Sequence, residues 1–277
     1  MIIQRHATKC PCWTTNKAQQ ALEPNKQSVN YRAYYERFAN RDIFLILHSL
    51  GYEQPSADTQ AERWDKATNE NAIAHAVVDS ITGVTIQVLE WGMRGWHVGG
   101  ANNNLSIGVE MCESDAIAYD REKSWLFTVK NAARAKQHCR TAYAGAVDTF
   151  AFLCKTFGLN PMTRILSHKE AHDRGIAGNH GDPEHYWSGL GIGYTMDGFR
   201  ADVASLMQQS QPEPEPEPDP VGFLGFPDVS EGDWYADALA WAVEKKVILP
   251  SGKPFNPSFP LDKATAVVLL RRLWNSL

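Results

Sequence analysis

Short apolar runs separated by polar segments recur through most of the chain and predict β-strands. Ile43–Leu47 is a continuous apolar run with the length of a strand that is buried on both faces. Val84–Leu89 is rich in β-branched residues and nearly alternates, and Ser106–Met111 and Arg164–Ser167 are further short candidates. These segments predict a mixed sheet whose central strands are covered on both faces.

The apolar pattern takes the period of a helix between the last two of these strands. Apolar residues recur every three or four positions from Tyr143 to Phe157, as they do on the buried face of an amphipathic helix. Gly158 and Pro161 follow and are expected to end that helix. A second helix is expected at Met196–Met207. The predicted fold class is therefore α/β, with a mixed central sheet flanked by helices.

Alternating proline and carboxylate residues divide the chain near its C-terminal end. The segment Pro212–Pro220 can form neither a helix nor a sheet ladder, and its like charges repel one another, so it predicts an extended, semi-rigid spacer. We therefore expect a larger α/β domain at residues 1–207, a linker at 208–222 and a small all-helical module at 223–277.

Composition narrows the classes of partner. The formal net charge is -5, and most of it comes from the four spacer carboxylates, so the charge favours neither nucleic acid nor an anionic membrane surface. No run approaches the roughly 18 apolar residues of a membrane span, and the first residues lack the apolar core of a secretory signal. The five cysteines show no disulfide spacing. These features predict synthesis in a cytoplasm, with ordinary thiols.

Two histidines and two carboxylates stand at the ends of predicted strands or in a loop that follows one. His48 and Glu110 end two strands, and His168 follows a third, with Asp182 in a loop marked by glycine and proline. Two histidines and an aspartate suit a catalytic zinc site, which has three protein ligands and an open fourth position. A lone histidine at a strand end is more often structural, and other histidines lie nearby, so spacing alone leaves both interpretations open. The nearby histidines are His172, His180 and His185.

Several longer stretches occur in an order that is typical of one enzyme family. They are Ile2-Ile3, Ala7-Thr8-Lys9, Ile46-Leu47-His48-Ser49, Arg94–Gly100, Asn103-Asn104, Ser106–Glu113, Ser167–Glu170, Gly175–Asp182 and Met196–Val203. Through them, residues 2–207 resemble the type-2 N-acetylmuramoyl-L-alanine amidases, zinc enzymes that share their fold with peptidoglycan-recognition proteins and many phage endolysins. The likeness is greatest to the endolysins of phages and prophages.

The resemblance implies roles for particular residues. Zn2+ would be held by His48, His168 and Asp182. Glu110 falls on the family's catalytic glutamate, which takes a proton from the attacking water and passes it to the leaving amine. His180 stands where many relatives have a lysine that stabilises the oxyanion, and a histidine could donate a hydrogen bond to the same group.

The resemblance also implies the substrate and its setting. The scissile bond would be the amide between N-acetylmuramic acid and L-alanine in bacterial peptidoglycan, with Trp96 and His97 in the substrate cleft. Such an endolysin or autolysin would reach the cell wall by holin-type release, lysis or non-classical export. Two alternatives are a peptidoglycan-recognition protein that binds without cutting and a sporulation or recycling amidase. The complete set of metal and acid–base residues favours an enzyme.

The C-terminal module resembles a single S-layer homology repeat. The resemblance rests on Phe226–Val229, Trp234-Tyr235, Phe255–Pro257 and two expected helices at Ala236–Lys246 and Asp262–Trp274. It implies binding to a secondary cell-wall polymer. Where the family has Thr-Arg-Ala-Glu, this chain has Asp-Lys-Ala-Thr, whose Lys263 could meet an anionic polymer group but lacks the fork of arginine. The alternative is a spacer or a module for self-association into a homo-oligomer.

Overall fold

The computed structural model describes residues 1–68, 72–120, 122–123, 126–209, 223–250, 253–257, 261 and 263–276. The chain forms two compact units, Met1–Ser210 and Gln211–Leu277. The predicted linker, residues 208–222, lies outside the described residues apart from its first two positions, 208 and 209. Those two positions continue the last helix of the first unit, which ends at Gln209.

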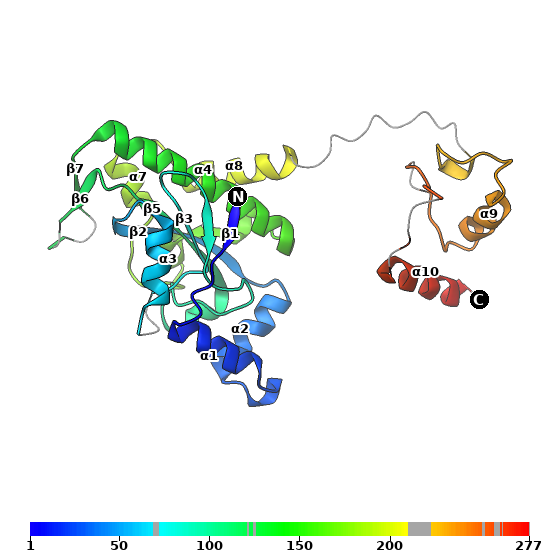
Figure 1. Ribbon diagram of the computed structural model, residues 1–277, viewed down its shortest axis with the longest axis horizontal. Helices are drawn as coiled ribbons and strands as arrows, with labels where there is room; N and C mark the ends of the chain where they lie inside the picture. The colour runs from blue at the N-terminus through cyan, green and yellow to red at the C-terminus, as the bar shows by residue number, and fades with distance from the viewer. Residues whose placement is uncertain are drawn as a thin grey trace. The chain divides into compact units, whose positions relative to one another are not determined.

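A mixed sheet forms the centre of the first unit (Figure 1). Within the described ranges it has six strands in the order β1-β4-β3-β5-β2-β8, and the pair β3–β4 is antiparallel whereas the other neighbours are parallel. This arrangement confirms the predicted fold class. The strands are β1 (Ile2–Gln4), β2 (Phe44–Glu53), β3 (Ala76–Val78), β4 (Thr85–Gln87), β5 (Ser106–Glu113) and β8 (Ile165–Ser167), and a separate pair consists of β6 (Ile117–Tyr119) and β7 (Phe127–Val129).

The first unit contains both of the helices that the sequence predicts. The long one begins well before the predicted face and ends where Gly158 adopts the left-handed conformation that favours glycine, with φ of 63°. The helices are α1 (Pro11–Gln20), α2 (Val29–Ala39), α3 (Ala57–Asp65), α4 (Ala132–Phe157), α5 (Pro161–Arg164), α6 (His168–Asp173), α7 (Glu184–Gly189) and α8 (Met196–Gln209), with short 3-10 helices η1 (Pro24–Lys26) and η2 (Gly100–Leu105).

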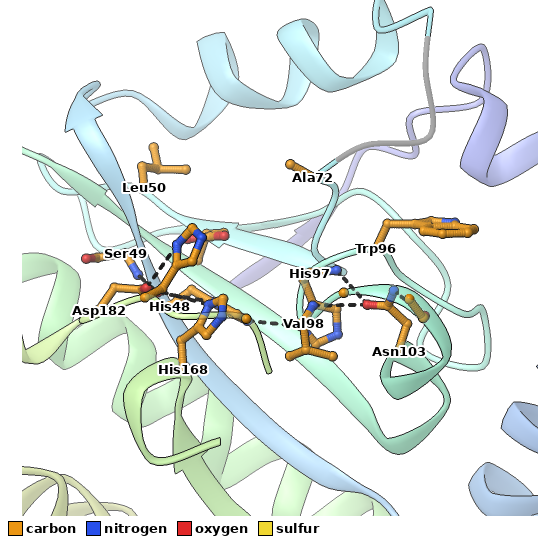
Figure 2. Close-up of a pocket in the computed structure, with 15 residues that line it drawn as sticks. His48, Ser49, Leu50, Ala72, Trp96, His97, Val98, Asn103, His168 and Asp182 are labelled. Carbon is orange, nitrogen blue, oxygen red and sulfur yellow. Dashed lines mark hydrogen bonds and ion pairs between the residues drawn. The ribbon is translucent and has the colours of Figure 1, made fainter. Parts of the chain in front are cut away.

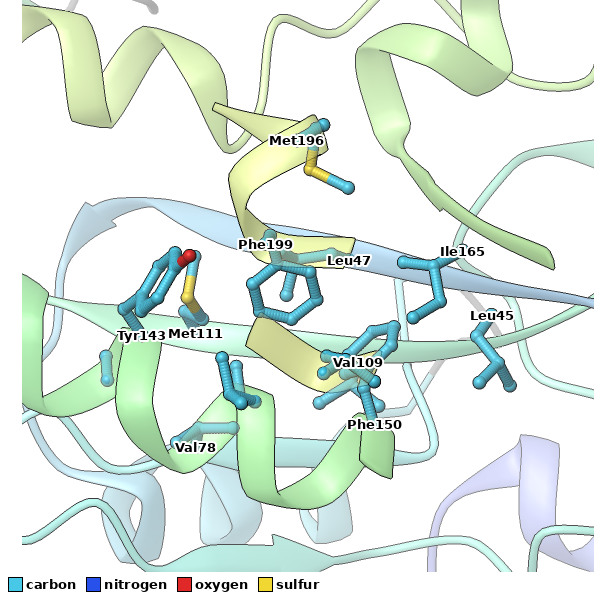
Figure 3. Close-up of a cluster of buried hydrophobic side chains, with 14 of the residues drawn as sticks. Leu45, Leu47, Val78, Val109, Met111, Tyr143, Phe150, Ile165, Met196 and Phe199 are labelled. Atoms are coloured by element: carbon cyan, nitrogen blue, oxygen red, sulfur yellow. The ribbon is translucent and has the colours of Figure 1, made fainter. Parts of the chain in front are cut away.

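One face of the sheet packs against α4 and α8 and forms the main hydrophobic core (Figure 3). Leu45 and Leu47 of β2 lie in this core beside Val109 of β5, and Phe150 of α4 meets Phe199 of α8 edge to face, with ring centroids 5.2 Å apart. Aromatic contacts of this kind add to the free energy gained by burying the rings. The core therefore fixes which side chains of β2 and β5 point toward α4.

The opposite face of the sheet carries the alternate side chains of the same strands. Side chains of neighbouring residues in a strand point to opposite faces, so those of Ile46 and His48 project away from α4. In β5, the side chain of Glu110 projects to the same face, on which Gly108 also lies. Part of this face packs against α1 and α3 in a second core. His48 lies inside β2, which continues through Glu53, instead of at the strand end that the apolar run predicts.

The second unit is small and helical. It contains η3 (Phe223–Gly225), α9 (Ala236–Glu244) and α10 (Lys263–Ser276). Phe226, Val229 and Leu239 form its buried centre. Along α10, the apolar side chains of Val267, Leu270 and Trp274 are exposed. Among the described residues of the whole chain, none of the helices combines the length and apolar character needed to cross a membrane.

The central core predicts a contrast between two phenylalanines of α4. Phe150 is fully buried and Phe152 is 44% exposed. Phe150→Ala leaves a cavity and is expected to lower the free energy of unfolding of the first unit by about 3–5 kcal/mol. Phe152→Ala is the matched control, with an expected change within about 0.5 kcal/mol. Denaturant unfolding followed by circular dichroism measures both, and equal losses would contradict this assignment of the core.

Candidate metal centre

The pairing of parallel strands places three of the predicted residues side by side. His48 of β2 is in register with Glu110 of β5, and on the other side Leu47 is in register with Ser167, the last residue of β8. His168 is the next residue and begins α6. Neighbouring strands lie about 4.8 Å apart, so the three side chains are adjacent on the face that points away from α4.

A tight strand-to-helix turn sets the position of His168. The side-chain hydroxyl of Ser167 accepts a hydrogen bond from the backbone N–H of Glu170, and the Glu170 carboxylate accepts one from the backbone N–H of Ser167. This reciprocal capping box begins α6 directly at His168. Arg200 of α8 pairs with the same glutamate at 2.8 Å. His168 is thus carried on a turn that the capping box and Arg200 hold in place.

The loop before α7 brings the fourth predicted residue to the same place. The carboxylate of Asp182 accepts a hydrogen bond from the backbone N–H of Ser49 at 3.3 Å, and its backbone carbonyl accepts one from the N–H of Lys169 at 3.2 Å. These two bonds attach the loop to β2 and to α6. Asp182 is almost fully buried.

Three potential ligand atoms converge at this point (Figure 2). His48 Nδ1 lies 3.0 Å from His168 Nδ1, and the two oxygens of Asp182 lie 3.3 Å from His48 Nδ1 and 3.5 Å from His168 Nδ1. Ligands placed tetrahedrally at typical zinc distances are about 3.4 Å apart. Two imidazole nitrogens and a carboxylate oxygen at these separations fit a zinc ion, and the three residues form a buried group that could hold a metal.

Burial and mutual charge set the proton affinities of this group. Burial, together with the charge of the neighbouring His48, lowers the pKa of His168 to about 3. For His48, burial also favours the neutral ring, but the carboxylates of Glu110 and Asp182 outweigh it and leave the pKa raised. Burial opposes the charge of Asp182, yet the hydrogen bond with His48 and the nearby rings hold the pKa of its carboxyl below the usual range.

Glu110 differs from the three candidate ligands. Burial raises the pKa of its carboxyl to about 7, although the charge of His48 acts in the opposite direction. Its Oε2 atom is buried and has no hydrogen-bond partner among the described residues. An unpaired buried carboxyl oxygen is costly, and a pKa near neutrality suits a group that both accepts and gives a proton. This carboxyl is therefore available to a bound water or substrate.

His97 lies behind His48 and orients its ring. Its Nδ1 lies 2.9 Å from His48 Nε2, and its Nε2 lies 3.4 Å from the hydroxyl of Ser106. If the Nδ1 atom of His48 binds a metal, its Nε2–H would donate to Nδ1 of His97, and the Nε2–H of His97 would donate to Ser106. Burial holds the pKa of His97 well below its usual value, so this ring stays neutral. Histidine ligands are commonly held in one tautomer by such a partner.

These residues line one pocket in the first unit. Trp96 lines the same pocket and packs under the guanidinium of Arg94 at 4.3 Å. His180 stacks on His168 with 4.5 Å between ring centroids, and its side chain is 66% exposed, so it stands at the opening. Lys263, predicted to contact a polymer, begins α10 of the second unit with an exposed side chain, and that role stays a prediction.

Comparison with known proteins identifies the family of this chain. The sequence profile of N-acetylmuramoyl-L-alanine amidase matches residues 40–185, slightly more than half of the chain. The chain belongs to this amidase family. The match includes His48, Glu110, His168 and Asp182.

Solved structures show a partial likeness to this amidase. PlyL is 21% identical, with 58% of this chain and 82% of PlyL covered at a TM-score of 0.40. The Staphylococcus aureus hydrolase AmiA, solved in complex with its ligand, is 16% identical, with 60% and 72% covered at a TM-score of 0.46. The catalytic domain of XlyA is 20% identical, with 58% and 85% covered at 0.39. Curated protein sequences gave no match.

Two residues of the stretches that resemble the family position the site of this amidase, although neither of them has a role predicted from the sequence. Asn103 accepts hydrogen bonds from the backbone N–H groups of His97 and Val98 at 2.8 and 3.0 Å, and so shapes the loop that carries His97. Gly108 leaves room for the His97 ring, because a Cβ atom there would lie 2.5 Å from His97 Nδ1. The glycine inside an apolar strand was a usable signal, since it often marks a close approach.

Gly108 gives a direct test of this packing. Gly108→Ala forces the His97 ring to move and is expected to cost about 1–3 kcal/mol of unfolding free energy. Gly193→Ala is the matched control, because among the described residues nothing lies within 4 Å of a Cβ atom there. Its expected change is within about 0.5 kcal/mol. Equal unfolding free energies for the two variants would contradict the close contact between Gly108 and His97.

Proposed function

We propose that this amidase is a zinc-dependent peptidoglycan hydrolase that cleaves the amide between N-acetylmuramic acid and L-alanine. The observation that carries the proposal is the buried group of His48, His168 and Asp182 beside the unpartnered Glu110 oxygen in one pocket. When bound, zinc would supply Lewis acidity, which activates water and polarises an amide carbonyl. The family supplies the substrate class.

Glu110 performs the proton transfers in this proposal. As a carboxylate it takes a proton from the water that attacks the scissile carbonyl, and as a carboxylic acid it returns that proton to the departing amine of L-alanine. A pKa near 7 lets one residue serve in both steps near neutral pH. Its register with His48 keeps the carboxyl next to the metal ligands.

His180 assists at the opening of the pocket. A ring N–H there can donate to the oxygen that becomes negatively charged when water attacks the carbonyl. Its partial exposure lets the side chain meet the substrate, and stacking on His168 limits the positions of the ring. Trp96 offers an apolar wall to the glycan or peptide that enters the pocket.

The second unit fits a role in attachment to the cell wall. Its likeness to a single S-layer homology repeat supports binding of a secondary cell-wall polymer, and Trp234 is 94% exposed, as suits a side chain that meets a ligand. An amidase joined by a spacer to such a module has the organisation of a phage or prophage endolysin, or of an autolysin. Self-association through the exposed apolar side of α10 is the alternative role.

Glu110→Gln separates the chemistry from the metal site. The variant keeps the size of the side chain but cannot accept the proton, so activity on purified peptidoglycan is expected to fall by about 10²- to 10⁴-fold with zinc content unchanged. New L-alanine amino termini, reducing sugar ends and bound zinc measure the outcome. Glu62→Gln, at an exposed position on α3, is the control and should stay active.

Chelation of the unaltered chain completes this test. Removal of the metal should abolish release of L-alanine termini, and added zinc should restore it. Near-normal activity of Glu110→Gln would overturn the proposed role of Glu110. Tight binding of cell walls without any new termini, on walls that another amidase cuts, would instead identify a peptidoglycan-recognition protein.

Removal of the second unit tests its attachment role. A chain that ends at residue 209 keeps all of α8 and the whole metal site. It is expected to sediment less with purified cell walls than the full chain does, while its rate on soluble muropeptides stays the same. Equal sedimentation with a change from oligomer to monomer would favour self-association as the role of this unit.

A further inference from the structure

Three side chains outside the candidate metal-binding group form a partly buried hydrogen-bonded chain. Glu113 ends β5, Tyr119 ends β6 and His185 lies in α7. The hydroxyl of Tyr119 lies 2.5 Å from a Glu113 carboxylate oxygen and 2.7 Å from Nε2 of His185. Tyr119 therefore donates to Glu113 and accepts from His185, which fixes the proton of the His185 ring on Nε2.

One end of this chain is attached to the segment that follows His48. The backbone N–H of Gly51 donates to the Glu113 carboxylate at 3.0 Å, and the backbone N–H of Tyr119 donates to the carboxylate of Glu53 at 2.8 Å. Both contacts lie in the part of β2 where its register with β5 shifts. This irregular segment begins right after the paired residues His48 and Ser49, so its position affects how those residues are held.

The other end is attached to the loop that carries Asp182. His185 lies three residues beyond Asp182, and its backbone N–H donates to the carbonyl of Gly181 at 2.9 Å. The Asp182 carboxylate in turn accepts from the N–H of Ser49. The contacts thus form a closed network that runs from β2 through Glu113, Tyr119 and His185 to Asp182 and back to β2.

This network contains a carboxyl group, that of Glu113, which the hydrophobic core does not need. Glu113 is fully buried, and the pKa of its carboxyl is raised to about 7 by burial, against the effect of the Tyr119 hydrogen bond. Burying such a group costs free energy, and an apolar side chain would fill the same space at less cost. Its contacts lead toward two of the candidate metal ligands, which indicates a task in holding them.

We propose that Glu113, Tyr119 and His185 are positioning residues that hold Asp182 against His48 at the separation a metal ion requires. The inference rests on the metal site of the proposed function. Tyr119 has the central place, because its hydroxyl joins the β5 carboxylate to the α7 histidine. Without that hydroxyl, the Ser49–Asp182 hydrogen bond still joins the loop to β2, but the second link, through Glu113 and His185, is lost.

Tyr119→Phe tests the proposal with metal affinity as the readout. It keeps the ring and removes the bridging hydroxyl, and the dissociation constant for Zn2+, measured by competition with a chromogenic chelator, is expected to rise about 10- to 100-fold. The visible absorption of the Co2+-substituted protein should also change, because Asp182 moves relative to the two rings. The unfolding midpoint of the metal-free variant is recorded alongside.

Tyr143→Phe is the matched control. Its hydroxyl also donates to a carboxylate, that of Asp202 at 2.7 Å, but in the core between α4 and α8 on the other face of the sheet. This variant should lose some stability and keep the zinc affinity and the Co2+ spectrum of the unaltered chain. A second pair compares His185→Gln, which retains an N–H donor and should keep more affinity, with His185→Leu.

The outcomes separate this inference from the proposed function. Unchanged zinc affinity and Co2+ spectrum in Tyr119→Phe, with only the unfolding midpoint lowered, would overturn the positioning role and leave the metal site intact. Equal weakening by Tyr143→Phe would also overturn it, because the effect would then be one of general stability. Failure of the unaltered chain to bind zinc would overturn the proposed function itself.

Discussion

The register of β2 between two parallel neighbours is the constraint on which the site depends. In parallel pairing, corresponding residues of adjacent strands project from the same face, so one alignment places His48 beside both Glu110 and the residue that follows β8. A shift of one residue in β2 would turn His48 into the hydrophobic core and bring Leu47 to the metal group. The apolar side chains packed under α4 and α8 therefore secure the chemistry on the opposite face.

The site brings together polar groups whose burial costs free energy, and it places like groups close to one another. Two histidine rings, a third ring behind them and two carboxyls share one pocket, and His48, His97 and Asp182 have partners in a backbone N–H or a neighbouring ring. Rigid elements provide these partners: the β2 backbone for Asp182, the capping box for His168 and the loop held by Asn103 for His97. Such support is what keeps ligand atoms close together before a cation is present.

Much of this could be predicted from sequence because it is local. The apolar runs and the helical period of Tyr143–Phe157 gave the central strands and α4, and the strand ends suggested which polar residues share an edge. The sequence did not give α1 or α2, whose few buried residues leave no clear apolar face. It also placed His48 at a strand end, since Ser49, Gly51 and Glu53 interrupt the apolar pattern and hide the continuation of β2.

The longer-range contacts had no local signal at all. Tyr119 and His185 are 66 residues apart, and the closure of the Asp182 loop onto Ser49 spans 133 residues. Neither pair is marked by spacing or by periodicity. Family resemblance named Asp182 as a ligand, but the network of contacts that holds it appears only in three dimensions.

The unequal proton affinities of the two candidate ligand histidines, His48 and His168, have a consequence for metal capture. A metal ion competes with protons for the same ring nitrogens. The pKa of His168, about 3, leaves a lone pair free even in mildly acidic surroundings, whereas the carboxylates of Glu110 and Asp182 raise the pKa of His48. Protons therefore compete with an incoming ion more strongly for the ring of His48 than for that of His168.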